Sequence, residues 1–181
     1  NSLSKRISSQ LGELNLSKTS KDDQRELIPS EKYEVIRTKN DLDKWCEEIL
    51  KQKLFAIDTE TTSLDTLSAE LVGISLCIGI GKACYIPVAH KANQPENSDL
   101  KEEQLDRDMV LRRLKPLLLD ESILKIGHNI KYDIKVLYKY KCYVNSFDDT
   151  MLMSHCINGG RQRHSLDSIA KDLLNHETIK L

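Results

Sequence analysis

An apolar run that ends in two closely spaced acids constrains this chain more than any other feature. Leu54 to Ile57 predict an interior strand, and Asp58-Thr59-Glu60 follows directly. Because strand side chains alternate between faces, Asp58 and Glu60 should point to the same side. At about 5 Å and an effective dielectric near 20, their charges repel by roughly 3 kcal/mol. A divalent cation held by hard oxygen ligands would offset this repulsion. The alternative is a polar turn after a core strand.

The order of the apolar runs predicts a mixed α/β fold with helices on the faces of a sheet. Strands are expected at 33–36, 54–57, 71–78, 83–88 and 123–127. The second, third and fourth of these follow one another closely, which favours antiparallel pairing.

Helices are expected between and after these strands. The first is capped by Asn40 or Asp41. The second runs from about 101 to 119, with Pro116 ending or kinking it, and the third starts at Asn129. Two more are expected near 149–158 and 165–175. Residues 1–30 are rich in Ser, Lys, Asp and Gln, which predicts a flexible linker or tail before a domain at 31–181.

Composition narrows the function classes. The net charge is -1, so any nucleic-acid role must depend on a local site rather than on a basic surface. No apolar run approaches the ~18 residues that span a bilayer, so no membrane partner is expected. The five cysteines form no Cys-x-x-Cys pair, which favours reduced thiols in a cytoplasmic protein over a zinc site.

A second acidic segment follows the strand at 123–127. Asn129 and Asp133 are four residues apart, so on a helix they would share a face. A helix that follows a strand directly has its first turn at the sheet edge, where α/β proteins bind ligands. Alternatively, Asp133 favours the helix dipole and needs no metal.

These segments together resemble the proofreading 3′–5′ exonuclease domain of bacterial DNA polymerase I, a family A polymerase. Residues 58–65, Asp-Thr-Glu-Thr-Thr-Ser-Leu-Asp, resemble its first exonuclease motif, and residues 129–133 resemble its second, Asn-x-x-x-Asp. Residues 85–90, 149–152 and 163–168 also fall where similar stretches fall in that family. The resemblance runs in order from Tyr33 to the C-terminus.

The resemblance implies an RNase H-like fold with a mixed five-stranded sheet, three antiparallel strands and then parallel ones, flanked by helices. It also implies two-metal hydrolysis of a phosphodiester at the 3′ end of single-stranded DNA. Asp58 would bridge both metals, Glu60 would bind the tighter one and Asp133 the second. Carboxylate ligands favour Mg²⁺ or Mn²⁺.

Five further residues match family positions that hold the DNA 3′ end: Thr61, Leu64, Asn129, Tyr132 and Arg163. Leu64 is expected to wedge against the last bases and Arg163 to contact a phosphate. The alternatives are that Leu64 and Tyr132 are packing residues and that Arg163 is a solvated surface charge.

The family's third motif, Tyr-x-x-x-Asp, does not occur in these 181 residues. We therefore expect a fragment truncated before that motif, with impaired activity, from a bacterial cytoplasmic DNA polymerase. Its polymerase domain would follow at the C-terminal side, and a 5′ nuclease domain is possible before residue 1. Asp149 and Asp167 match other family positions and are expected to be helix caps or surface residues.

Two other interpretations remain open on the sequence. One is a related enzyme, such as an RNase D-like exoribonuclease or a helicase-linked exonuclease. The other is a non-catalytic module that keeps the fold as a structural or DNA-binding part of a polymerase.

Overall fold

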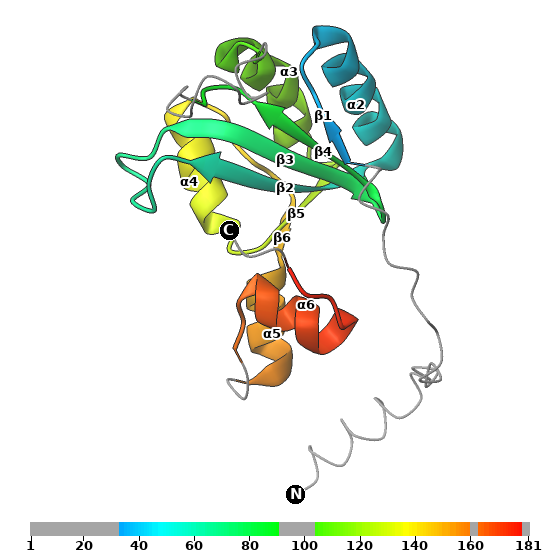
Figure 1. The fold of residues 1–181 in the computed structure, drawn as a ribbon, viewed down its shortest axis with the longest axis vertical. Helices are drawn as coiled ribbons and strands as arrows, with labels where there is room; N and C mark the ends of the chain where they lie inside the picture. The colour runs from blue at the N-terminus through cyan, green and yellow to red at the C-terminus, as the bar shows by residue number, and fades with distance from the viewer. Residues whose placement is uncertain (1–32, 91–103, 160–162, 179–181) are drawn as a thin grey trace, which may run out of the picture.

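The computed structural model describes residues 33–90, 104–159 and 163–178. The tail expected over 1–30 lies outside the described residues. Six strands form one mixed sheet in the order β1-β4-β3-β2-β5-β6 (Figure 1). The strands are β1 (Tyr33–Val35), β2 (Leu54–Thr61), β3 (Leu71–Gly79), β4 (Lys82–Pro87), β5 (Leu124–Gly127) and β6 (Phe147–Asp149).

The pairing is antiparallel between β2, β3 and β4, and parallel where β5 joins β2, β6 joins β5 and β1 joins β4. The mixed α/β architecture is therefore as predicted, but the sheet has six strands where five were expected. The strands β1 and β6 form its two edges and have three residues each. Strands this short carry too little period-two pattern to predict their pairing.

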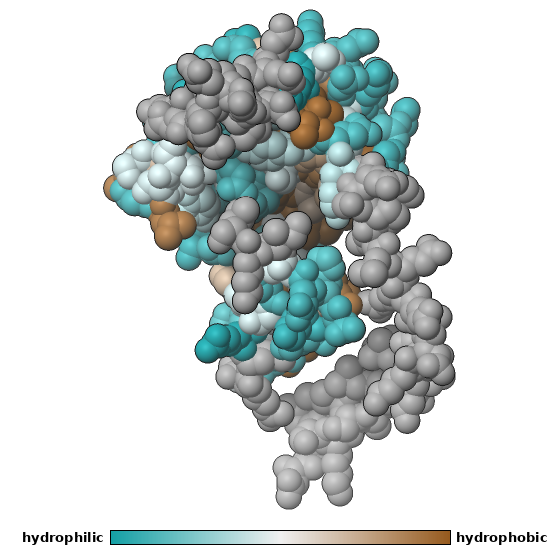
Figure 2. Space-filling view, in the orientation of Figure 1, coloured by the Kyte–Doolittle hydropathy of each residue, from teal (hydrophilic) through white to brown (hydrophobic). Residues whose placement is uncertain are grey.

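Five helices flank the sheet within the described residues. They are α2 (Lys39–Gln52), α3 (Arg107–Leu119), α4 (Lys131–Lys139), α5 (Thr150–Asn158) and α6 (Leu166–Leu174). Helices α2 and α3 lie side by side along the sheet, whereas α4 packs near β2 and the pair α5 and α6 extends beyond β6 (Figure 1). On the face shown in Figure 2 the surface is mostly hydrophilic, with hydrophobic residues in a few small areas.

Helix starts follow their capping residues. Helix α2 begins at Lys39 and is capped by Thr38, not by Asn40 or Asp41 as predicted, because the Thr38 hydroxyl accepts from the backbone N–H of Asp41. Helix α3 begins at Arg107, where Asp106 caps it, rather than near residue 101, and residues 101–103 are outside the described residues.

Pro116 was predicted to end or kink α3; it does not end the helix but lies inside it. The helix continues to Leu119 because its buried face remains packed in the core through Leu114, Leu117 and Leu118. Packing of an apolar face contributes more to helix stability than local propensity does.

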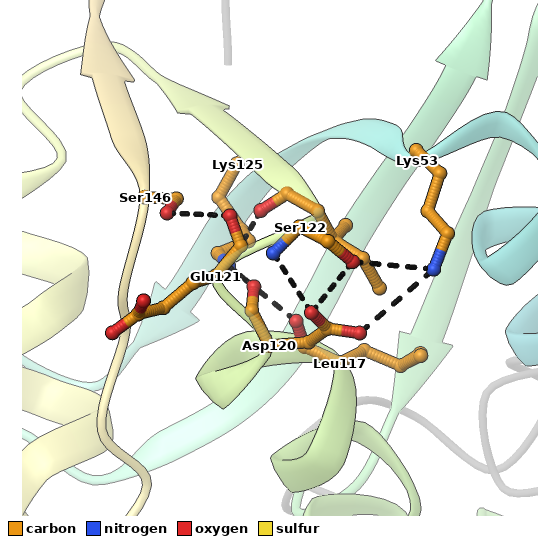
Figure 3. A network of polar contacts seen from close by, with 8 residues as sticks. Lys53, Leu117, Asp120, Glu121, Ser122, Lys125 and Ser146 are labelled. Carbon is orange, nitrogen blue, oxygen red and sulfur yellow. Dashed lines mark hydrogen bonds and ion pairs between the residues drawn. The ribbon is translucent and has the colours of Figure 1, made fainter.

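Lys125 fixes the connection between α3 and β5 (Figure 3). Its side chain is fully buried, and its ammonium group donates to the carbonyl oxygens of Ile123 at 2.7 Å, Asp120 at 2.8 Å and Leu117 at 3.5 Å. Burial lowers the pKa of Lys125. A buried ammonium is tolerated here because backbone oxygens solvate it at the end of a helix.

Two further expectations concern cysteines and membranes. All five cysteines are free thiols, as predicted, although only Cys46, Cys84 and Cys142 are buried. Within the described part of the chain, no helix combines the length and apolar character needed to cross a membrane.

Candidate active site

The end of β2 presents two carboxylates on one face. Phe55, Ile57 and Thr59 are buried, whereas Asp58 and Glu60 are exposed on the opposite face. This alternation is the one predicted from the sequence. A shift in the pairing register with β3 falls directly after Glu60, where the strand is about to leave the sheet.

Asp133 reaches this strand end from α4. The paired residues of β2 and β5 run only as far as Ala56 and Ile126, so the following part of β2 has no partner on that side. There the backbone N–H and the hydroxyl of Thr59 both donate to Asp133 Oδ1, at 2.9 and 2.6 Å. Asp133 thus completes the hydrogen bonding of β2 where β5 stops.

Asn129 is not on the helix that carries Asp133. Helix α4 begins at Lys131, and Asn129 lies before it with φ 59°, in the left-handed region. The prediction that Asn129 and Asp133 share a helix face is therefore wrong. Asn129 nevertheless lies near the site, because the turn it forms leads directly into the first turn of α4.

One cavity of about 480 Å³ collects nearly all the predicted site residues. It is lined by Asp58, Glu60, Thr61, Leu64, Asn129, Tyr132 and Asp133, together with Thr59, Thr62, Ser63 and His128. Arg163 does not line it; this residue lies exposed just before α6. Segments about 70 residues apart in the sequence thus share one concave surface.

The three acids interact unfavourably in this cavity. Desolvation, followed by repulsion from Asp133 and Glu60, raises the pKa of Asp58 to about 6. Desolvation also raises the pKa of Asp133, although its hydrogen bonds from Thr59 act in the opposite direction. Carboxylates that repel one another in a cleft are frequent at functional sites and favour a bound cation.

Polar contacts organise the loop after β2. The Tyr132 hydroxyl donates to the carbonyl oxygen of Ser63 at 2.5 Å and also contacts the Thr61 hydroxyl. Leu64 is 94% exposed, so it is not a packing residue. Tyr132 is half-buried and packs against the core, so it combines a structural contact with a position in the cavity.

The donor set fits a hard divalent cation in its chemistry. Three carboxylates line the cavity, and their mutual repulsion is the feature a cation would relieve. Within the described residues, however, no three His, Cys, Asp or Glu side chains are already close enough together to count as a metal-binding group.

Sequence reasoning missed two residues of this region. Thr59 lies on the buried face of β2, and nothing in its sequence context predicts that it contacts Asp133. Asp149 was expected to cap a helix and does cap α5, but it also contacts the turn at Asn129. Asp167 is exposed in the first turn of α6, as expected for a surface residue.

Comparisons with known proteins agree with this geometry. Residues 33–181 match the model of a 3′–5′ exonuclease family. The chain is 41% identical over 152 residues to DNA polymerase I of Pseudomonas aeruginosa, a match that covers 82% of this chain and 16% of that protein. The chain thus spans only a small part of this polymerase relative.

Two solved structures share the fold. NrnC of Brucella melitensis with bound Mg²⁺ aligns with a TM-score of 0.54 and 24% identity, over 82% of this chain and 63% of that one. RNase D of Escherichia coli aligns with a TM-score of 0.57 and 24% identity, over 81% of this chain and 34% of that one. At this identity the likeness shows the RNase H-like fold alone, whereas the polymerase match is much stronger in sequence. The chain belongs to the 3′–5′ exonuclease family and is homologous to the exonuclease region of DNA polymerase I.

Proposed function

We propose that this chain is the proofreading part of a DNA polymerase I, which hydrolyses the 3′-terminal phosphodiester of single-stranded or frayed DNA. The observation that carries the proposal is the meeting of Asp58, Glu60 and Asp133 at one cavity, where desolvation and then repulsion from the other two acids raise the pKa of Asp58. Homology to a polymerase exonuclease region favours DNA over RNA as the substrate.

The three carboxylates would hold Mg²⁺ or Mn²⁺. Asp58 is repelled by both other acids, so it would be shared by two ions, while Glu60 and Asp133 would each hold one. When bound, the ions supply charge stabilisation for the phosphodiester and lower the pKa of the attacking water. Thr59 keeps Asp133 oriented toward them through Oδ1.

The other cavity residues would hold the DNA end. Leu64 is exposed and apolar at the rim, so it can stack against the last base. Asn129 and Tyr132 offer polar groups to the sugar and phosphate, and Thr61 can do so once its contact with Tyr132 opens. Arg163 would reach a phosphate of the same strand only by moving toward the cavity. Selection of mismatched ends would come from their easier fraying.

The longer protein would carry a polymerase domain after this region and a 5′ nuclease domain before it. In that arrangement, residues 1–30 would be a linker and 31–181 the exonuclease domain. The 181 residues contain no Tyr-x-x-x-Asp motif. We therefore expect metal and DNA binding to be easier to detect than hydrolysis.

The test is Mn²⁺ binding by isothermal titration, followed by Mn²⁺-dependent binding of a 5′-fluorescein DNA 12-mer. Asp58→Ala should abolish both. Asp43→Ala removes the same charge at the surface ion pair with Arg113, far from the cavity, and should change neither.

Carboxylate-independent Mn²⁺ binding, or no binding at all, would contradict the proposal and favour a structural module. An RNA 12-mer of the same sequence provides the second comparison. Tighter binding of RNA than of DNA would favour an RNase D-like activity.

A further inference from the structure

Asp149 connects two segments that are far apart in the sequence. It is 8% exposed, and its carboxylate accepts four backbone N–H groups. Oδ1 accepts from Met151 at 2.9 Å and Leu152 at 3.3 Å, which belong to the first turn of α5, and also from Asn129 at 3.0 Å. Oδ2 accepts from Ile130 at 3.1 Å. One side chain therefore caps α5 and holds the turn before α4.

Thr150 holds the same turn beside it. Its hydroxyl donates to the carbonyl oxygen of Gly127 at 3.1 Å, and His128 Nδ1 lies 3.0 Å from the same hydroxyl oxygen. Because the hydroxyl proton is used by Gly127, His128 Nδ1 must be the donor to Thr150. Two consecutive residues thus bind the stretch from Gly127 to Ile130.

This turn needs such support. Asn129 has φ 59°, in the left-handed region that residues other than glycine rarely adopt and that asparagine tolerates better than most. Ile130 precedes α4 and makes no capping hydrogen bond with its own side chain. The backbone N–H groups of Asn129 and Ile130, directly before α4, therefore take their acceptor from another part of the chain, and Asp149 provides it.

We propose that Asp149 is a positioning residue for the nuclease site. By holding the turn at Asn129 and Ile130, it sets where Asn129, Tyr132 and Asp133 stand relative to the acids of β2. The inference rests on the proposed function, since it assigns Asp149 a task in the same site. Asp149 itself does not line the cavity.

Asp149→Asn separates this task from helix capping. Asparagine caps helices about as well as aspartate, so the amide oxygen can keep the bonds to α5. The amide NH₂ then faces the N–H of Ile130, and two donors cannot bond to each other. The matched control is Asp106→Asn, which makes the same change at the cap of α3, where Oδ1 accepts from Met109.

The stability of the turn is measured by amide hydrogen exchange at Ile130 and Asn129. The integrity of the site is measured by Mn²⁺-dependent binding of the 5′-fluorescein DNA 12-mer. Asp149→Asn should speed exchange at Ile130 and weaken DNA binding about tenfold, which corresponds to about 1.4 kcal/mol. Asp106→Asn should keep the DNA affinity within about twofold of the wild type, even if its melting temperature falls as much as that of Asp149→Asn. A merely structural role would weaken binding in neither variant or in both.

Thr150→Val is a second variant, for the case that Asp149→Asn does not fold. It removes the bonds to Gly127 and His128 and should also weaken DNA binding, by a smaller factor. The inference is overturned by a folded Asp149→Asn chain that loses protection at Ile130 yet binds DNA as tightly as the wild type. If the wild-type chain itself shows no Mn²⁺-dependent DNA binding, the proposed function is overturned. That outcome is distinguishable from failure of the inference alone, because then the wild type and every variant fail to bind.

Discussion

Thr59 holds Asp133 through two hydrogen bonds to the same carboxylate oxygen, from its backbone N–H at 2.9 Å and its hydroxyl at 2.6 Å. The two residues are 74 positions apart in the sequence. The contact ties α4 to the unpaired edge of β2 and brings the third acid to Asp58 and Glu60. Assembly of the site therefore depends on where β5 stops pairing.

Thr59→Val should separate the hydroxyl bond from the backbone bond. Valine has nearly the same shape but cannot donate, so a hydrogen bond to a buried carboxylate is lost. We expect the free energy of unfolding to fall by about 2 kcal/mol in urea denaturation. Mn²⁺ affinity should also fall, because Asp133 is then held by the Thr59 backbone N–H alone. Thr62→Val is the control inside the same cavity: Thr62 is exposed, and its hydroxyl accepts from the backbone N–H of Glu70.

Asp58 should make the metal-free protein less stable as pH rises. Its pKa in the folded protein, about 6, lies above the ~3.9 of an unfolded chain. Between these values the folded state binds more protons than the unfolded state, so the free energy of unfolding falls from pH 4 toward pH 6. Asp58→Asn should remove that fall and stabilise the metal-free protein at pH 7 by about 1 kcal/mol, after allowance for solvent screening.

Metal addition should reverse which of the two proteins, wild type or Asp58→Asn, is the more stable. In EDTA at pH 7, Asp58→Asn is expected to melt above the wild type. With Mn²⁺ at 100 times its dissociation constant, the wild type should gain about 2.7 kcal/mol and the variant almost nothing. Thermal melts with and without metal measure both effects, and an equal gain in the two proteins would contradict the assignment of Asp58 as a ligand.

Lys125→Met should destabilise the fold without touching the cavity. Methionine preserves most of the buried volume, but the carbonyl oxygens of Leu117, Asp120 and Ile123 lose their common donor. We expect a loss of about 3 kcal/mol in the free energy of unfolding. Lys51→Met removes a charge that is paired only at the surface of α2 and should cost less than about 0.5 kcal/mol.

Two glycines of β3 should respond differently to alanine. A Cβ on Gly73 would overlap the phenol oxygen and ring of Tyr85, whereas a Cβ on Gly79 meets nothing within 4 Å. Gly73→Ala must push Tyr85 aside and should cost about 2 kcal/mol. Gly79→Ala should be neutral or slightly stabilising. Equal melting temperatures would show that the Tyr85 ring moves freely.

Local patterns were sufficient for much of the fold. The run Leu54 to Ile57 predicted a strand and the shared face of Asp58 and Glu60, because side-chain alternation is a property of any strand. The helix predicted near 149–158 is present at Thr150–Asn158, since Asp149 is a strong local cap. Pro116 does not end α3, which was one of its two predicted effects, because core packing outweighs its local cost.

The amino-acid sequence by itself determined the strand-borne acids, the order of strands and helices and the family, because these depend on neighbours along the chain. Only the tertiary structure decided that Thr59 would hold Asp133, that Asn129 would adopt a left-handed turn, and that Asp149 would support that turn. These contacts join residues 19 to 74 positions apart. They arise where paired strands end and leave backbone groups to be satisfied, which no local pattern records.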